Sequence, residues 1–186
     1  MFYLCFSCGA GWSDMKLNLG NQYYYFGGGG YNYLHKSLPN DYMVESLYLA
    51  PSIKIYNYND EYIIAKQTPH RKNIVSNFSY EVLYPIHHHI IHRDERKFSK
   101  RDSVLLDYME KMKWEGIGSV DDNMKMEEIA SKIIDTIPKY QEILSSSVNY
   151  YIIEKKLDKI HGPLDKLAYQ KKRKELDVPE ALELEE

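Results

Sequence analysis

The sequence predicts an α+β domain, with an antiparallel sheet of about 5–7 strands and 2–3 helices packed mainly on one face. Tyrosine accounts for 18 of the 186 residues, and most tyrosines lie in short runs with branched side chains, such as Ile53–Tyr58 and Tyr150–Ile153. Runs of this kind fit a half-buried strand. An apolar stripe at residues 126–137 has helical spacing and needs a surface to cover. A chain of this length is most simply one domain, which we place at residues 14–182.

Composition and charge exclude some classes of function. The chain carries a formal net charge of −3, with 44% hydrophobic and 27% charged residues, which is ordinary for a globular protein. Nucleic acid is therefore not an expected partner, because its phosphates bind concentrated positive surfaces. No apolar run approaches the roughly 18 residues that cross a bilayer. The sequence predicts no cofactor and no catalytic set, so we expect a non-enzymatic role.

Residues 1–13 are interpreted as a truncated signal and lipidation leader with a tether. Ser7 precedes Cys8 and Gly9–Gly11 follow it, an order that suits a bacterial lipoprotein in which Cys8 is the first mature residue. Cys5 fits the third position before a lipidated cysteine poorly, and a charged n-region is missing. The two cysteines supply only half of a zinc ribbon, and a redox pair would need a helix N-terminus. The membrane is thus an expected partner only if Cys8 carries a lipid.

Two hairpins are expected in the first part of the domain. Their strands are Lys16–Leu19, Tyr23–Phe26 and Tyr31–Leu34, and then Ile53–Tyr58 and Tyr62–Gln67. The four glycines 27–30 form a turn, because glycine reaches positive φ without strain. A phosphate-binding loop is disfavoured there, since no Lys-Ser or Lys-Thr pair follows the glycines. Asn59 and Asp60 suit the tight turn of the second hairpin.

A helix is the clearest element of the second half. Apolar side chains recur at the spacing of one helical face, at Met126, Ile129, Ala130, Ile133, Ile134 and Ile137. Pro138 ends or bends this helix, and a short second helix follows up to Leu144. Before it, residues 70–120 are interpreted as a variable insertion that carries one amphipathic helix after Asp102.

The last part of the chain predicts a third hairpin and a helix. Tyr150–Lys155 and Ile160–Pro163 are expected strands, and this hairpin must join the rest of the sheet because an isolated one is marginal in water. Asp165 is a suitable N-cap for a helix that ends near Leu176. Residues 183–186 are interpreted as an acidic tail.

Several of these segments occur in an order that resembles a known family. They are Cys8–Asp14, a tyrosine hairpin, Tyr62–Gln67, Tyr150–Lys156, Gly162–Leu164 and Leu176–Pro179. In this order the chain resembles a family of short, uncharacterised bacterial lipoprotein-like proteins, known only as a domain of unknown function. The resemblance covers residues 8–67 and 148–182, and the leader departs from the family's pattern. It implies a location in the cell envelope with Cys8 as the site of lipid attachment, and it offers no catalytic residue.

A histidine segment is the candidate metal site. In an extended chain His87 and His89 project from one face with Cα atoms about 6.5–7 Å apart, and they could share a zinc or copper ion. His92 lies an odd number of residues from both, so a regular strand turns it away. The simpler interpretation is a solvated histidine-rich loop. A metal-binding enzyme that uses residues 87–92 is the second alternative function.

The tyrosines of the first hairpin are candidate binding residues. Tyr23, Tyr25, Tyr31 and Tyr33 could present a row of rings that stacks on a glycan or docks a protein. Packing in the core or across strands is the other interpretation. We therefore expect an uncharacterised, non-enzymatic cell-envelope lipoprotein domain that binds a protein or glycan through its tyrosine-rich sheet. The first alternative is a cytoplasmic interaction or immunity-type protein.

Overall fold

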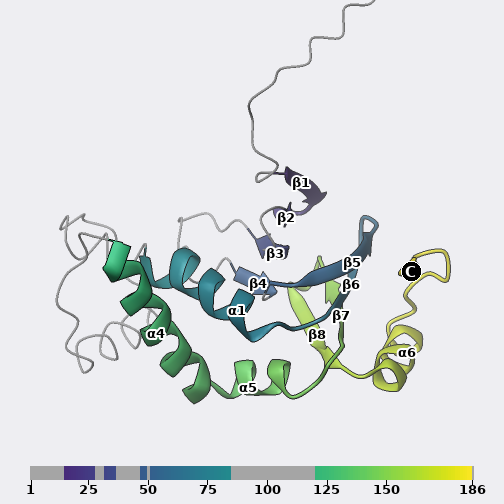
Figure 1. The fold of residues 1–186 in the computed structure, drawn as a ribbon. Helices are drawn as coiled ribbons and strands as arrows, with labels where there is room; N and C mark the ends of the chain where they lie inside the picture. Colours follow the sequence, from purple (N-terminus) through teal and green to yellow (C-terminus); the bar gives the residue numbers. More distant parts are fainter. Residues whose placement is uncertain (1–14, 28–31, 37–46, 50, 85–119, 186) are drawn as a thin grey trace, which may run out of the picture.

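The fold confirms the predicted α+β class. The computed structural model describes residues 15–27, 32–36, 47–49, 51–84 and 120–185 (Figure 1). These residues contain eight strands in two antiparallel sheets, together with four α-helices, slightly more helices than predicted. None of the described helices is long and apolar enough to cross a membrane.

The first sheet has four antiparallel strands in the order β1-β2-β3-β4. They are β1 (Met15–Gly20), β2 (Tyr23–Gly27), β3 (Tyr33–Lys36) and β4 (Leu47–Leu49). A tight turn joins β1 to β2, where Gly20, Asn21 and Gln22 have φ values of 84°, 50° and 67°. Glycine and asparagine tolerate this left-handed backbone better than other residues do. Because β2 lies between β1 and β3, Tyr25 is paired on both sides and lies opposite Leu34.

The second sheet has the order β5-β6-β7-β8 and contains the predicted second and third hairpins. Its strands are β5 (Ile53–Tyr58), β6 (Tyr62–Gln67), β7 (Asn149–Glu154) and β8 (Lys159–Leu164). The side chain of Asn59 holds the β5–β6 turn, since its Oδ1 accepts hydrogen bonds from the backbone N–H groups of Glu61 and Tyr62. Strands β6 and β7 pair along their whole length, although residues 68–148 separate them in the chain.

The two sheets pack against each other, so the strands form two layers with a shared core. This core buries Leu19, Tyr23, Tyr25 and Leu34 from the first sheet and Ile53, Ile63, Ala65, Tyr151 and Ile153 from the second. Its rings meet directly, with the Tyr25 and Tyr56 centroids 4.2 Å apart. Full burial of a large apolar side chain stabilises a fold by about 1.5–3 kcal/mol, so this layer is a main source of stability.

Polar contacts also hold the sheets together. The buried Lys155 ammonium donates hydrogen bonds to two backbone carbonyls, one of them that of Leu19 on the first sheet. Its burial lowers the pKa of Lys155 below the usual value, and the charge of Asp60 opposes that shift. In the turn between β7 and β8, Asp158 accepts a hydrogen bond from the Tyr23 hydroxyl and pairs with the Lys36 ammonium. The contacts of Leu19, Tyr23 and Lys36 each join a strand of the first sheet to the second.

Most of the helices form a core of their own. They are α1 (Arg71–Phe78) with its π-helical continuation η1 (Ser79–Leu83), then α4 (Val120–Thr136) and α5 (Pro138–Leu144). The apolar stripe on α4 is confirmed, and it packs against α1, η1 and α5. Ile74, Phe78 and Leu83 are buried in the same core, although they lie in the stretch interpreted as an insertion.

The last helix, α6 (Lys166–Glu175), lies apart from the others and packs on β7 and β8 (Figure 1). Asp165 is its N-cap, as predicted, and accepts a hydrogen bond from the backbone N–H of Ala168 at 2.7 Å. Tyr169 joins the segment after the helix in covering Ile64 and Ile152, on the side of the second sheet that faces away from the first. The second sheet is therefore covered on both faces.

Candidate functional site

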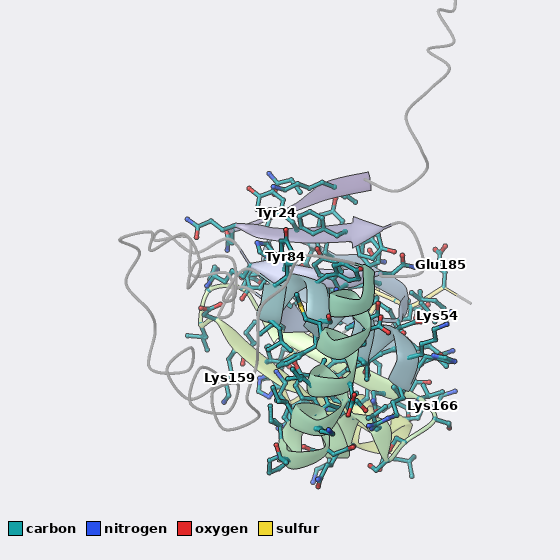
Figure 2. The ribbon with its side chains drawn as sticks, turned by 60° about the vertical axis from the view of Figure 1, so that its left-hand side comes forward. Tyr24, Lys54, Tyr84, Lys159, Lys166 and Glu185 are labelled. Carbon is teal, nitrogen blue, oxygen red and sulfur yellow. The ribbon has the colours of Figure 1, made fainter. Side chains whose placement is uncertain are left out.

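The outward face of the first sheet carries a cluster of aromatic side chains. Strand alternation places Tyr23 and Tyr25 toward the core, so their neighbours Tyr24 and Phe26 point outward. The register then puts Lys16 and Tyr33 opposite Phe26, on either side of it. His35 and Asn18 likewise lie opposite Tyr24. We call Lys16, Tyr24, Phe26, Tyr33 and His35 the aromatic face; Figure 2 labels Tyr24 within it.

The rings of the aromatic face contact one another closely. Phe26 and Tyr33 stack across strands with centroids 5.2 Å apart and planes 6° from parallel. His35 meets Phe26 edge-on at 5.5 Å. The Lys16 ammonium lies over the Tyr24 ring at 4.1 Å and over the Phe26 ring at 5.4 Å. Such contacts contribute about 0.2–1 kcal/mol for each cross-strand pair, and they hold the rings in place.

The electrostatics of this face favour a neutral histidine beside a cation. Burial lowers the pKa of His35 below its usual value, and the nearby Lys16 charge lowers it further. At neutral pH His35 therefore contributes an uncharged ring, and Lys16 supplies the positive charge. Aromatic rings, one cation and tyrosine hydroxyls suit binding, and this described face lacks the carboxylate that would pair with His35 in acid–base chemistry.

The structure corrects the row of rings expected from the sequence. Tyr23 is 0% exposed and Tyr25 only 7% exposed, and both lie in the core between the sheets. Tyr33 is half-buried on the outward face, and its neighbours there are Phe26 and His35. The physical reason is parity: the pairing puts Tyr33 opposite Phe26, so Tyr33 faces away from Tyr23 and Tyr25. Alternating tyrosines signal a strand but not which of its faces is covered.

The remaining predicted site residues lie outside the described part of the chain. These are Cys8, Tyr31, His87, His89 and His92. Within the described ranges, no group of three or more His, Cys, Asp or Glu side chains is placed to hold a metal ion. A lipid on Cys8 and a metal at the histidine segment remain predictions.

A histidine–carboxylate pair on the second sheet was not predicted. The Nε2 atom of His161 lies 2.6 Å from Oε1 of Glu154, and both side chains are largely buried. The pair joins neighbouring strands β7 and β8 diagonally, so it stabilises their register. The sequence did not reveal this pair, because the two residues lie on either side of the hairpin turn and only the register of the strands brings them together.

The fold is that of an α+β domain whose first antiparallel sheet carries a cluster of ordered aromatic side chains on its outward face. A family model described as "Protein of unknown function (DUF3997)" matches residues 123–186. The match includes β7, β8 and α6, whereas the aromatic face lies outside it. Comparison with curated proteins and with solved structures found no match.

Proposed function

We propose that the protein is a non-enzymatic domain of the bacterial cell envelope that binds a protein partner through the aromatic face. The observation that carries the proposal is a set of half-buried rings on the outward side of a sheet, held in position by their own contacts. Tyrosine, phenylalanine and histidine rings give large contact area at low cost in conformational entropy. The neighbouring Lys16 adds a charge that orients a partner.

A protein partner fits this surface better than a glycan. A sugar stacks on the open face of a ring, and here Phe26 and Tyr33 cover each other's faces. The Lys16 ammonium lies over the Tyr24 ring. These contacts occupy one face of each ring and so reduce the flat ring surface on which a sugar could stack, whereas packing against the side chains of a polypeptide does not need an open ring face. A glycan that binds with comparable affinity would contradict this choice.

The envelope location rests on the order of residues around Cys8. A small residue precedes this cysteine and a glycine-rich tether follows it, and lipid attachment there would hold the domain at a membrane surface. Mass spectrometry of the protein from its native host tests the point directly. An acylated Cys8 supports the location, and an unmodified Cys8 in the cytoplasmic fraction would favour a cytoplasmic interaction protein instead.

Site-specific photo-crosslinking tests the aromatic face. A benzoylphenylalanine at position 24 replaces one aromatic ring by another on the proposed surface. The matched control is position 80, where Tyr80 is 50% exposed on η1 and belongs to the helical core's surface. In living cells we expect a discrete crosslinked protein from position 24 and none from position 80. Equal labelling at both positions, or labelling only at position 80, would reject the proposal.

A further inference from the structure

A small cavity lies on the other sheet, between α6 and the outer face of the second sheet. Its volume is about 240 Å³, below the roughly 300 Å³ at which pockets for drug-sized ligands begin. Its lining comes from β6, β7, α6 and the C-terminal segment: Lys66, Tyr150, Lys166, Tyr169, Gln170, Arg173, Glu183 and Leu184. The cavity is independent of the aromatic face, which belongs to the first sheet.

The charges around this cavity are unbalanced. Three lining side chains are cationic, Lys66, Lys166 and Arg173, and one is acidic, Glu183. The formal charge of the lining is therefore +2, in a chain whose overall net charge is −3. Low-dielectric walls strengthen the field of such a cluster, so the cavity favours a dianion over a neutral or singly charged molecule.

The spacing of the α6 residues explains how the cluster arises. Tyr169 and Gln170 follow Lys166 by three and four residues, and Arg173 follows them by four and three, so all four lie on the side of the helix that borders the cavity. Figure 2 labels Lys166, at the start of this helix. Of the basic run at residues 171–174, Arg173 is the described member that lines this cavity, while Lys172 pairs with Glu175.

Arg173 is held in place by the segment that follows the helix. Its Nη2 donates hydrogen bonds to the backbone oxygens of Pro179 at 2.9 Å and Leu182 at 2.7 Å. The guanidinium carbon lies 5.8 Å from the centroid of the Tyr169 ring. A guanidinium fixed in this way recognises an oxyanion without a further loss of side-chain entropy.

Tyr169 supplies an unused hydrogen-bond donor. The residue is 5% exposed, its ring stacks on Tyr150 with centroids 5.0 Å apart, and the proton of its hydroxyl has no acceptor among the described residues. Burial raises the pKa of Tyr169, against an opposing effect of Arg173, so the hydroxyl remains protonated at neutral pH. A buried donor without an acceptor is unfavourable, and an oxyanion beside it would remove that cost.

From this juxtaposition we propose that the cavity binds the phosphate group of a phosphate monoester, between Lys66, Lys166, Arg173 and the Tyr169 hydroxyl. A monoester carries a charge of about −1.5 to −2 at neutral pH, which matches the charge of the lining. The size of the cavity admits a phosphate with a small organic substituent. The same chemistry occurs in a soluble ester and in the headgroup of phosphatidic acid.

Titration calorimetry of the full chain tests the proposal, with glycerol 3-phosphate and inorganic phosphate as soluble probes at constant ionic strength. Vesicles of phosphatidylcholine with and without phosphatidic acid, in a co-sedimentation assay, test the lipid source. Saturable binding of a soluble probe supports a soluble ligand. Binding to phosphatidic acid vesicles alone supports the headgroup. Binding to neither overturns the proposal.

Two variants and a matched control locate the binding. Lys166→Gln removes an exposed cation from the lining, and Lys171→Gln makes the same charge change on the exposed side of α6. We expect Lys166→Gln to weaken binding roughly fivefold or more and Lys171→Gln to leave it nearly unchanged. Tyr169→Phe should also weaken binding while the melting temperature stays level or rises, because it removes an unpartnered hydroxyl. Equal effects of Lys166→Gln and Lys171→Gln, or unchanged binding by Tyr169→Phe, would overturn the assignment.

Discussion

Replacing Gln67 by leucine tests a buried network of hydrogen bonds that joins strands β6 and β7 to each other and to the backbone of Pro51. Gln67 is 0% exposed, and its Nε2 donates a hydrogen bond to the backbone oxygen of Pro51 at 3.0 Å. Its Oε1 accepts from the Tyr151 hydroxyl at 2.8 Å and from Nδ2 of Asn149 at 3.1 Å. Leucine retains most of the side-chain volume but offers no polar atom, so the substitution isolates the hydrogen bonds.

The expected loss follows from the groups that lose their partner. Gln67→Leu removes the acceptor of the Tyr151 hydroxyl and the side-chain donor to Pro51, while Asn149 keeps its bond to the backbone oxygen of Ile143 at 2.9 Å. A buried polar group left unpaired costs about 1–3 kcal/mol, so we expect the free energy of unfolding to fall by about 3–4 kcal/mol. Burial raises the pKa of Tyr151, so its hydroxyl stays protonated and still needs an acceptor at neutral pH.

Urea denaturation at pH 7 measures this loss through a double-mutant cycle. Tyr151→Phe alone should cost about 0.5–1.5 kcal/mol, the value of one ordinary hydrogen bond. The variant with both substitutions should be more stable than the sum of the single effects by about 1–2 kcal/mol, because the phenylalanine needs no acceptor. The exposed Gln170→Leu serves as the control and should change stability by no more than about 0.5 kcal/mol. Additive effects, or a loss below about 1 kcal/mol for Gln67→Leu, would refute the reasoning.

Two further predictions concern the two sheets. Burial first, and Lys16 second, lower the pKa of His35 below 6.5, so the unfolded chain binds more protons than the folded one in that range. The stability that neutral His35 contributes is therefore complete above pH 6.5 and is lost as the pH falls through the folded pKa. When the free energy of unfolding in urea is measured as a function of pH, His35→Gln should flatten this part of the curve, and an unchanged slope would contradict the assignment. Gly162→Ala should lower stability by at least about 3 kcal/mol. The new Cβ would lie 2.5 Å from the Tyr151 ring and 2.7 Å from the Tyr150 carbonyl, at a φ of 136°. Gly20→Ala, where φ is 84° and the nearest atom is the Lys155 Nζ at 3.3 Å, should cost only about 1 kcal/mol, and equal melting temperatures of the two variants would contradict the steric argument.

Local signals predicted the individual elements well. The strands at Ile53–Tyr58 and Tyr62–Gln67 have the predicted bounds, and Asp165 caps α6 as predicted. The second helix after Pro138 is also present, because the proline begins α5 at its first turn. Each of these signals acts within a few residues, where side-chain spacing and backbone preferences decide the conformation.

The arrangement of those elements depends on long-range contacts, which the spacing of residue types along the chain does not reveal. Both faces of a tyrosine strand can bury rings, so the sequence could not tell that Tyr23 faces the core and Tyr24 faces outward. The sequence did not predict the short strand β4 (Leu47–Leu49) or the helix at residues 71–78, because apolar side chains do not recur at a regular strand or helix spacing in either segment. The apolar stripe on α4 predicted a helix, but its partner surface consists of other helices.

The candidate sites were less predictable than the elements. The aromatic face combines residues of three strands, and only the observed register places Tyr33 beside Phe26. The cavity under α6 joins Lys66 to residues that follow it by 84 to 118 positions, so no local pattern could reveal it. The basic run at residues 171–174 is visible in the sequence, but its spacing alone does not assign Arg173 to the inner side of the helix.

The pairing of β6 with β7 has a consequence for synthesis of the chain. While the ribosome makes residues 68–148, the β5–β6 hairpin has completed one side of β6, but the N–H and C=O groups on its other side have no strand to meet. Ile64 on this strand also lacks the cover that Tyr169 later supplies. Exposed edges of this kind attract strands from neighbouring chains. The nascent chain is therefore most prone to aggregation just before Asn149 emerges from the ribosome. A translational stall in that interval would prolong the exposure of the unpaired β6 edge.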